Sequence, residues 1–520
     1  MFCLNWIAKT ICKLIDIICF IYSNLRYPSR RNKIPSVEND FLLIPAIEIA
    51  QRIKEVKLKA LDVVKAYLTR IEEVNPIINA VIKSRENAIR DAEAIDEKLA
   101  NERENQLENL SQLPLLGVPF TVKDTVYVKG MPVCAGLVSR KDETAPEDAP
   151  SVFNLRQAGA IPIAVTNVPE LAMSFDTSNC LFGRTNNPYD LSLIAGGSSG
   201  GEGALISSAG SIIGLGSDIG GSIRFPALFC GIFGHKTTPG IVSTDGKYPT
   251  LAPGKAPLFS FGPMCRYASD LKPMLKAMAG PRIECLLKID SNVDLSKLRV
   301  FYMLDNGNPW NSRVASETKN AILKVVSHFE KTYGVMCTNV NLEKMRDSFS
   351  MWSASLGEAK GTPMSVLMND NKGEINLFLE IISKIFGRSS HTAVALGFAL
   401  NEKIVSLLPK TNKISEIKEL KQQLIDILGD DGIFLYPCFP EISVKHDTIL
   451  FKFLNISYTT VFNVTSLPVT QCPLGLSKSG VPLGVQVAAN EFNDHLTIAV
   501  ANEIEKIFGG WVPPFSVNIK

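Results

Sequence analysis

The sequence is poor in the residues that build metal and redox sites. Its 520 residues include five histidines and eleven cysteines, and no His-x-x-x-His or Cys-x-x-Cys pair has ligand spacing. The cysteines are odd in number and scattered, which is typical of reduced thiols in the cytosol. We therefore expect no metal and no cofactor in the functional site.

An excess of charge of one sign is also missing. The net charge is +2, from 54 basic and 52 acidic residues, so we expect no basic face and no nucleic-acid partner. No Ser/Gly/Pro-rich linker and no repeat divides the chain, although its length alone suggests three or four domains. We expect an N-terminal segment over residues 1–33 and one catalytic domain over residues 34–520.

Two glycine-flanked serine sites lie between residues 196 and 227 and are the strongest signal in the chain. The first is GGSSGG with Ser198 and Ser199, and the second is GGS with Ser222. Glycine permits sharp turns and lets backbone amides face an anion. Together, the two loops predict a preorganised site for an attacking hydroxyl and an oxyanion.

Other interpretations of these loops fit less well. A phosphate-binding Walker loop requires lysine where Glu202 stands. A nucleophile elbow around Ser199 requires a strand before it and a catalytic histidine after it, but residues 189–195 indicate a loop. The downstream histidines, His446 and His495, fit surface or cap positions better. Glycines that only make turns would explain one loop more easily than both.

These motifs resemble the amidase signature family. The resemblance rests on GGSSGGEGALI and GLGSDIGGSIRFPA, together with GVPFTVKD at residues 117–124, FGRTNNPY at 182–189 and FNVTSLP at 462–468. It covers roughly residues 40–513. It implies an α/β fold with a large twisted mixed β-sheet sandwiched between helices. Within the family the chain is most similar to the fatty-acid amide hydrolases, and among these to the second type.

The resemblance also assigns roles to residues. It implies Ser222 as nucleophile, Ser198 as a bridging serine on a cis peptide bond, and Lys123 as general base. The remaining roles that it implies are an oxyanion hole formed by the backbone amides of Ile219, Gly220, Gly221 and Ser222, supporting hydrogen bonds from Ser199 and Arg224, and a substrate pocket at Met173 and Phe175.

The base role of Lys123 sets a requirement that the sequence context meets. Lysine accepts a proton only when it is neutral, so its pKa of about 10.4 must fall by roughly 2 to 3 units to work near pH 7 to 8. Lys123 lies in the apolar, strand-like run of residues 119–124, where burial would lower its pKa. Asp124 follows it, but successive strand side chains point to opposite faces.

Hydrophobic periodicity predicts alternating helices and buried strands. We expect amphipathic helices over residues 46–74, 84–107, 318–332 and 494–508, and strands over 115–122, 161–166, 298–304, 433–436 and 483–488.

The N-terminus is apolar over residues 2–25 but carries Lys9, Lys13 and Asp16 within a narrow arc of a helix. No charge-free run reaches the roughly 20 residues that a spanning helix needs. The pattern favours a helix that lies in the membrane surface, with the basic residues after it near anionic lipid. A spanning signal-anchor and a soluble packing helix remain alternatives.

The sequence thus predicts a membrane-associated serine hydrolase that cleaves long-chain fatty-acid amides, with its catalytic domain facing the cytosol. A homodimer is left open. The alternatives are an amidase of the same family for small polar amides, including a glutamine-hydrolysing amidotransferase subunit, and a catalytically silent lipid-binding protein.

Overall fold

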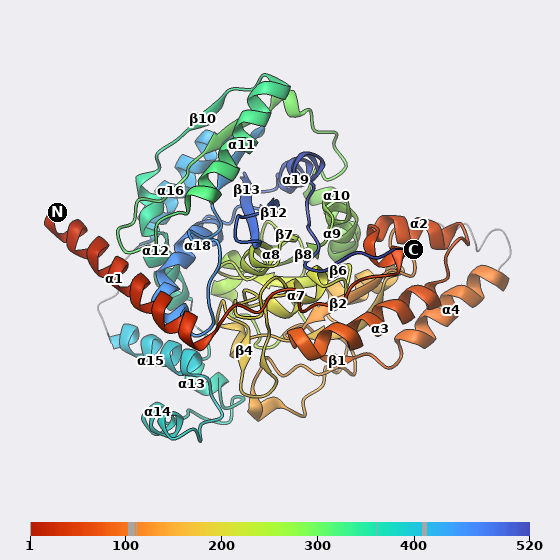
Figure 1. The fold of residues 1–520 in the computed structure, drawn as a ribbon, viewed down its shortest axis with the longest axis horizontal. Helices are drawn as coiled ribbons and strands as arrows, with labels where there is room; N and C mark the ends of the chain where they lie inside the picture. The colour runs from red at the N-terminus through yellow and green to blue at the C-terminus, as the bar shows by residue number, and fades with distance from the viewer. Residues whose placement is uncertain (1, 102–109, 111, 360, 408–412, 520) are drawn as a thin grey trace.

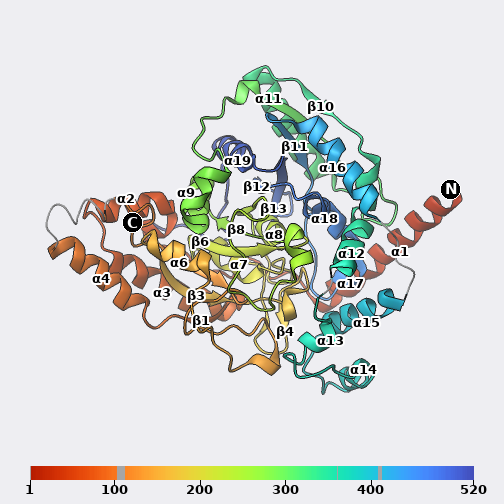
Figure 2. The same ribbon diagram turned by 180° about the vertical axis from the view of Figure 1, so that it is seen from behind.

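A central mixed sheet organises the molecule (Figures 1 and 2). The computed structural model describes residues 2–101, 110, 112–359, 361–407 and 413–519. Within these residues, eleven strands form one sheet in the order β1 (Val81–Ser84), β3 (Ile161–Thr166), β2 (Pro119–Lys123), β6 (Ile213–Asp218), β8 (Ser260–Cys265), β7 (Phe233–Lys236), β12 (Val469–Leu476), β13 (Pro482–Ala489), β11 (Gly432–Tyr436), β9 (Arg299–Tyr302) and β10 (Cys337–Asn339). The group β3–β2–β6 and the group β11–β9–β10 are parallel, and antiparallel pairs join them. A short hairpin, β4 (Ser178–Asn179) and β5 (Gly183–Arg184), stands apart.

The sheet is packed on both faces. In β11 the side chains of Ile433 and Leu435 belong to one buried cluster, and those of Phe434 and Tyr436 belong to another. Because successive strand residues point to opposite faces, these clusters lie on opposite sides of the sheet. This confirms the predicted α/β class and the sandwich of a mixed sheet between helices.

The helices fall into groups around the sheet. Figures 1 and 2 place α2 to α4 beside the β1 end, α11 and α16 beside the β10 end, and α13 to α15 together below α1. The bounds are α1 (Phe2–Arg26), α2 (Ala46–Lys54), α3 (Ala60–Ile78), α4 (Ala88–Asn101), α6 (Pro150–Gln157), α7 (Gly200–Ser207), α8 (Arg224–Phe229), α9 (Leu271–Ala279), α10 (Ile283–Leu286), α11 (Ser316–Tyr333), α12 (Ser348–Glu358), α13 (Met364–Leu367), α14 (Leu377–Ile385), α15 (Ala393–Leu407), α16 (Ile414–Leu428), α17 (Ile449–Lys452), α18 (Ser457–Val464) and α19 (Asp494–Phe508).

The predicted single helix over residues 46–74 is wrong in one respect, because a non-helical connection separates α2 from α3. Val56 has a left-handed φ of 55°. Its apolar side chain is 72% exposed. The amides of Ala60 and Leu61 donate instead to the Asp96 carboxylate at 2.8 and 3.0 Å, which fixes the start of α3. A contact from another helix thus overrides the local pattern.

The predicted helix over residues 84–107 begins later than expected. Residues 81–84 form β1 and pair with β3, so the helix α4 starts at Ala88. Residues 102–107 of that prediction lie outside the described residues. The remaining predicted helices and strands are found, and their ends differ by a few residues.

The N-terminal helix α1 projects from the body (Figure 1). Its described apolar side chains are largely exposed, with Leu14 at 55% and Ile18 at 60%. Within the described residues, no helix is long and apolar enough to cross a membrane.

Candidate active site

Three parallel strands end at the same edge of the sheet and bring the candidate residues together. Lys123 is the last residue of β2 and is aligned with Thr166, the last residue of β3, while β6 ends at Asp218. The first serine loop comes after the β4–β5 hairpin and leads into α7, and the second connects β6 to α8. The carboxyl ends of parallel strands are where sites form in α/β folds, because the loops after them converge there.

Lys123 and Ser198 are in direct contact. Lys123 Nζ lies 2.7 Å from Ser198 Oγ and 3.0 Å from Ser217 Oγ, and it donates a hydrogen bond to each. Both Lys123 and Ser198 are buried. The peptide bond between Gly197 and Ser198 is cis, as the family resemblance implies. The geometry thus brings the expected base and the expected bridging serine together.

Ser222 lies in the loop that faces them. The amide of Ser199 donates to the carbonyl of Ser222 at 3.1 Å, which joins the two serine loops. Ser222 is partly exposed, unlike the buried Lys123. Its hydroxyl makes no hydrogen bond to any residue that the structure describes. Ser222 is therefore open to solvent, whereas the Lys123 amine is enclosed.

The environment of Lys123 favours the neutral amine. Burial, with a smaller contribution from the nearby Lys247, lowers the pKa of Lys123 to about 7 against the opposing effects of Asp218 and Glu202. Asp124 is not one of the groups that act on it, because its carboxylate turns away and accepts hydrogen bonds from the amides of Cys134 and Gly136. A lysine with this pKa can accept a proton near neutral pH.

The amides of the loop after β6 point in two directions. The Gly221 N–H donates to Asp218 Oδ1 at 2.8 Å, so this amide is already engaged on the buried side. The N–H groups of Ile219, Gly220 and Ser222 make no hydrogen bond within the described ranges. Of the four amides expected to bind an oxyanion, three are therefore free to do so.

A buried ion pair between Asp218 and Arg224 stabilises this loop. Arg224 Nε and Nη2 donate to the Asp218 carboxylate at 3.1 and 3.0 Å, and both side chains are fully buried. Burial alone would raise the pKa of Asp218, but Arg224 holds it well below its usual range. Arg224 also donates to the side chains of Asn463 and Gln486 at 2.7 and 2.8 Å. Arg224 thus contacts the loop through Asp218, in line with its expected supporting position.

Two further residues donate to carbonyls of the same loop. Trp352 Nε1 donates to the Ile219 carbonyl at 2.7 Å, and Thr459 Oγ1 donates to the Gly220 carbonyl at 2.5 Å. Both donors are buried, and they fix the direction of the two peptide units. Sequence reasoning missed Ser217, Asp218 and Thr459, and it considered Trp352 only as an apolar residue of the middle region. Only Asp218 carried a signal, as the acidic residue inside GLGSDIGGS.

A buried carboxylate connects the lysine strand to the helix after the first serine loop. Glu202 in α7 accepts hydrogen bonds from Thr121 Oγ1 in β2 at 2.6 Å and Thr166 Oγ1 in β3 at 2.7 Å. Burial raises the pKa of Glu202 to about 7, and the two hydroxyls and Lys123 counter this. Thr121 and Lys123 lie on one face of β2, so Glu202 fixes α7 against the side of the strand that carries the base.

The two predicted pocket residues lie in different surroundings. Phe175 is buried in an aromatic cluster with Phe225 and Phe439, at centroid distances of 5.7 Å. Met173 is half-buried and lines a cavity of about 370 Å³ between the β3–α7 segment, α15 and α17. Met173 is therefore the one of the pair that faces open space.

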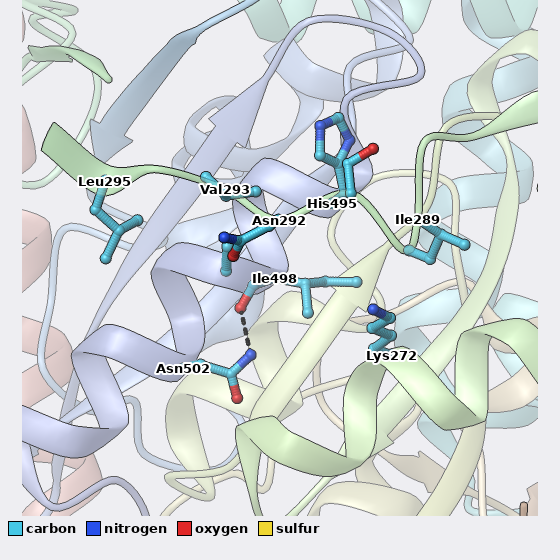
Figure 3. Close-up of a pocket in the computed structure, with 10 residues that line it drawn as sticks. Lys272, Ile289, Asn292, Val293, Leu295, His495, Ile498 and Asn502 are labelled. Carbon is cyan, nitrogen blue, oxygen red and sulfur yellow. Dashed lines mark hydrogen bonds between the residues drawn. The ribbon is translucent and has the colours of Figure 1, made fainter. Parts of the chain in front are cut away.

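A separate cavity of about 270 Å³ lies between α9, residues 289–295 and α19 (Figure 3). His495 lines it, and Asn502 in the same wall donates to the carbonyl of Ile498. None of the predicted site residues lines this cavity. His495 thus stands away from the serine loops, in agreement with the rejection of a histidine-dependent elbow.

Comparisons with known proteins agree with this geometry. The family model described as Amidase matches residues 62–498. Fatty-acid amide hydrolase 2 of Homo sapiens is 46% identical over 499 residues, which covers 94% of this chain and 93% of that protein. Fatty-acid amide hydrolase 2-B of Danio rerio is 44% identical over 492 residues and covers 93% of each. A solved structure of a fatty acid amide hydrolase superposes with a TM-score of 0.71 at 20% identity, over 91% of this chain and 86% of that one, which shows a shared fold.

Proposed function

Because the chain belongs to the amidase family and is an amide hydrolase, we propose that it cleaves long-chain fatty-acid amides through an acyl-enzyme on Ser222. The observation that carries the proposal is the contact between Lys123 Nζ and Ser198 Oγ at 2.7 Å, in a buried site beside the loop of Ser222. A neutral amine bound to a serine hydroxyl is a proton acceptor without histidine.

Acylation then proceeds by a proton relay. Lys123 takes the proton of Ser198 as Ser198 takes that of Ser222, and Ser222 Oγ bonds to the carbonyl carbon of the amide. The electron pair of the C=O double bond moves to the oxygen, where the amides of Ile219, Gly220 and Ser222 stabilise the negative charge. Collapse breaks the C–N bond, and the proton returns from Lys123 through Ser198 to the departing nitrogen. A neutral amine leaves and an ester remains on Ser222.

Deacylation repeats the relay with water. A water molecule gives its proton through Ser198 to Lys123 as its oxygen attacks the ester carbon. The proton then returns to Ser222 Oγ, and the carboxylic acid leaves. Both half-reactions begin with a neutral Lys123.

A fluorophosphonate probe tests the nucleophile. We expect covalent labelling of the wild-type protein and none of Ser222→Ala. The matched control is Ser243→Ala, because Ser243 contacts Asp245 outside the site. Labelling that persists in Ser222→Ala, or that is lost in the control, contradicts the proposal.

The fatty-acid substrate rests on the two relatives whose names state it, which are 46% and 44% identical to this chain. A panel of amides from acetamide to long-chain acylethanolamides tests it. We expect kcat/KM to rise with acyl length, and we expect no glutaminase activity. A preference for short polar amides or glutamine would instead support the amidotransferase-type alternative.

We also propose that α1 binds the membrane surface and that the catalytic domain faces the cytosol. The support is a face of α1 with exposed apolar side chains, followed by the basic residues Arg26, Arg30, Arg31 and Lys33. The helix α14 adds exposed Phe378 and Phe386. In Figure 2, α13 to α15 form a group below α1.

Flotation with anionic vesicles tests the membrane contact. The double variant Leu14→Glu/Ile18→Glu should remain at the bottom of the gradient while it still hydrolyses a soluble amide. The control Met336→Glu changes another exposed apolar residue, 83% exposed and outside α1, and should float like the wild type. Flotation of the double variant would show that another surface makes the contact.

A further inference from the structure

The amides of the loop after β6 take their direction from the carbonyls that precede them. In a trans peptide unit the C=O and the N–H that follows it point in opposite directions, so a hydrogen bond to the carbonyl also sets the direction of the amide. The peptide bonds within residues 218–222 are all trans. The partner of each carbonyl therefore identifies what directs the next amide.

Two of these amides are directed by α8 and α18. The Gly221 carbonyl accepts a hydrogen bond from the Phe225 amide at 2.8 Å, so the first turn of α8 directs the free N–H of Ser222. The Gly220 carbonyl accepts from Thr459 in α18, and the N–H of the same unit donates to a buried carboxylate, which holds this unit at both ends. Neither contact involves the peptide unit that ends in the Gly220 N–H.

The amide of Gly220 is directed by a side chain from a distant part of the sequence. Its peptide unit begins with the Ile219 carbonyl, which accepts a hydrogen bond from Trp352 Nε1 at 2.7 Å. Trp352 lies in α12, 133 residues after Ile219 and outside both serine loops. The free N–H of Gly220 therefore points away from the indole.

The indole ring also lies against the α-carbon of Gly220. A β-carbon at this position would lie 3.1 Å from Trp352 Cζ2, which is a tight contact. Gly220 does not have a left-handed φ, so glycine provides space for the indole here and is not required by the backbone angle. Trp352 is 7% exposed, and the ring of Phe349 packs against it at a centroid distance of 6.2 Å. This packing holds the ring against the loop.

We propose that Trp352 is a positioning residue for the oxyanion site, because its indole N–H fixes the direction of the Gly220 N–H. The inference rests on the proposed attack by Ser222 and adds a residue outside both serine motifs. The carbonyl oxygen of the substrate becomes negative during this attack, so a correctly directed N–H stabilises the transition state more than the bound substrate. Loss of the indole N–H should therefore slow the chemical step without weakening substrate binding.

Trp352→Phe tests this role, since it keeps an aromatic ring and removes the N–H. We expect kcat for amide hydrolysis to fall about tenfold, which is less than the loss of an oxyanion donor itself costs. A trifluoromethyl ketone analogue of the substrate, which forms a tetrahedral adduct with Ser222, should bind more weakly by the same factor. The Kd of the amide substrate, measured in the Ser222→Ala background, should change less than about twofold.

Trp511→Phe is the matched control. Trp511 is 8% exposed, and its Nε1 has no hydrogen-bond partner among the described residues, so the same substitution removes a buried indole without removing a hydrogen bond. Its kcat should stay within about twofold of the wild type. A kcat of Trp352→Phe that equals that of the control, or an effect confined to the substrate Kd, would overturn the positioning role.

Gly220→Ala provides a second measurement if Trp352→Phe does not fold. The added methyl group would displace the indole while the N–H of residue 220 remains, so kcat and the affinity for the trifluoromethyl ketone should both fall about tenfold. An unchanged kcat would overturn the role. If the wild type hydrolyses other amides but not fatty-acid amides, and Trp352→Phe slows that reaction, the proposed substrate fails and the positioning role stands.

Discussion

Replacing the buried lysine with an apolar residue of similar length should make the protein more stable as well as inactive. Lowering the pKa of Lys123 from 10.5 to about 7 corresponds to about 5 kcal/mol that the fold loses when this amine is charged. Lys123→Met removes that cost. It also removes the amine donor to Ser198 and Ser217, at about 1 kcal/mol each. The net gain is about 3 kcal/mol below pH 7, or about 3 °C in Tm for a chain of this size.

The difference in stability between Lys123→Met and the wild type should depend on pH. Between pH 7 and 10.5 the unfolded chain keeps the lysine proton and the folded chain releases it, so the wild type gains stability as pH rises through this range. The advantage of Lys123→Met is therefore full at pH 6 and disappears near pH 9. Differential scanning fluorimetry at both pH values measures it. Ser222→Ala is the matched control, since it is inactive but keeps the buried amine and should follow the wild type.

The same pKa governs the reaction. The wild-type kcat/KM should fall about tenfold per pH unit below pH 7 and level off above it, because only the neutral amine accepts the proton. A difference in Tm between Lys123→Met and the wild type that does not change with pH would refute the buried neutral lysine. A flat pH–rate profile between pH 5.5 and 8 would refute its role as base.

Three further substitutions test the supports of the site. Glu202→Gln keeps one acceptor oxygen for the threonine hydroxyls and removes the negative charge that Glu202 carries above its own pKa of about 7; because this charge raises the pKa of Lys123, the midpoint of the kcat/KM profile near pH 7 should move to lower pH, and an upward or absent shift contradicts this. Arg224→Lys leaves buried acceptors unpaired and should lower the free energy of unfolding by about 3 to 5 kcal/mol, measured by urea denaturation; a loss below about 1 kcal/mol would show that the ion pair is dispensable. Gly221→Ala places a β-carbon 2.5 Å from Thr459 Oγ1 at a φ of 122° and should abolish fluorophosphonate labelling, which wild-type labelling rates would disprove.

The sequence predicted features that depend on neighbouring residues. It did not predict features that depend on contacts between segments far apart in the chain. Lys123 could be placed because an apolar run ends at it, and the serine loops could be placed because their glycines follow or precede regular elements. The break before Ala60 depends on a carboxylate 36 residues away, which no local pattern reveals. The engaged amide of Gly221 depends on the side-chain direction of Asp218, which residue spacing does not specify.

Arg224, which contacts the loop of the proposed nucleophile through Asp218, is held by side chains from the last sixty residues of the chain. The lysine and both serine loops are complete by residue 222, but Asn463 lies 239 residues and Gln486 262 residues beyond Arg224. A nascent chain that has emerged from the ribosome only as far as residue 400 therefore carries every reacting group without the support that orients them. Such a chain should be unable to hydrolyse amides, and hydrolysis should begin only after Asn463 and Gln486 have been added.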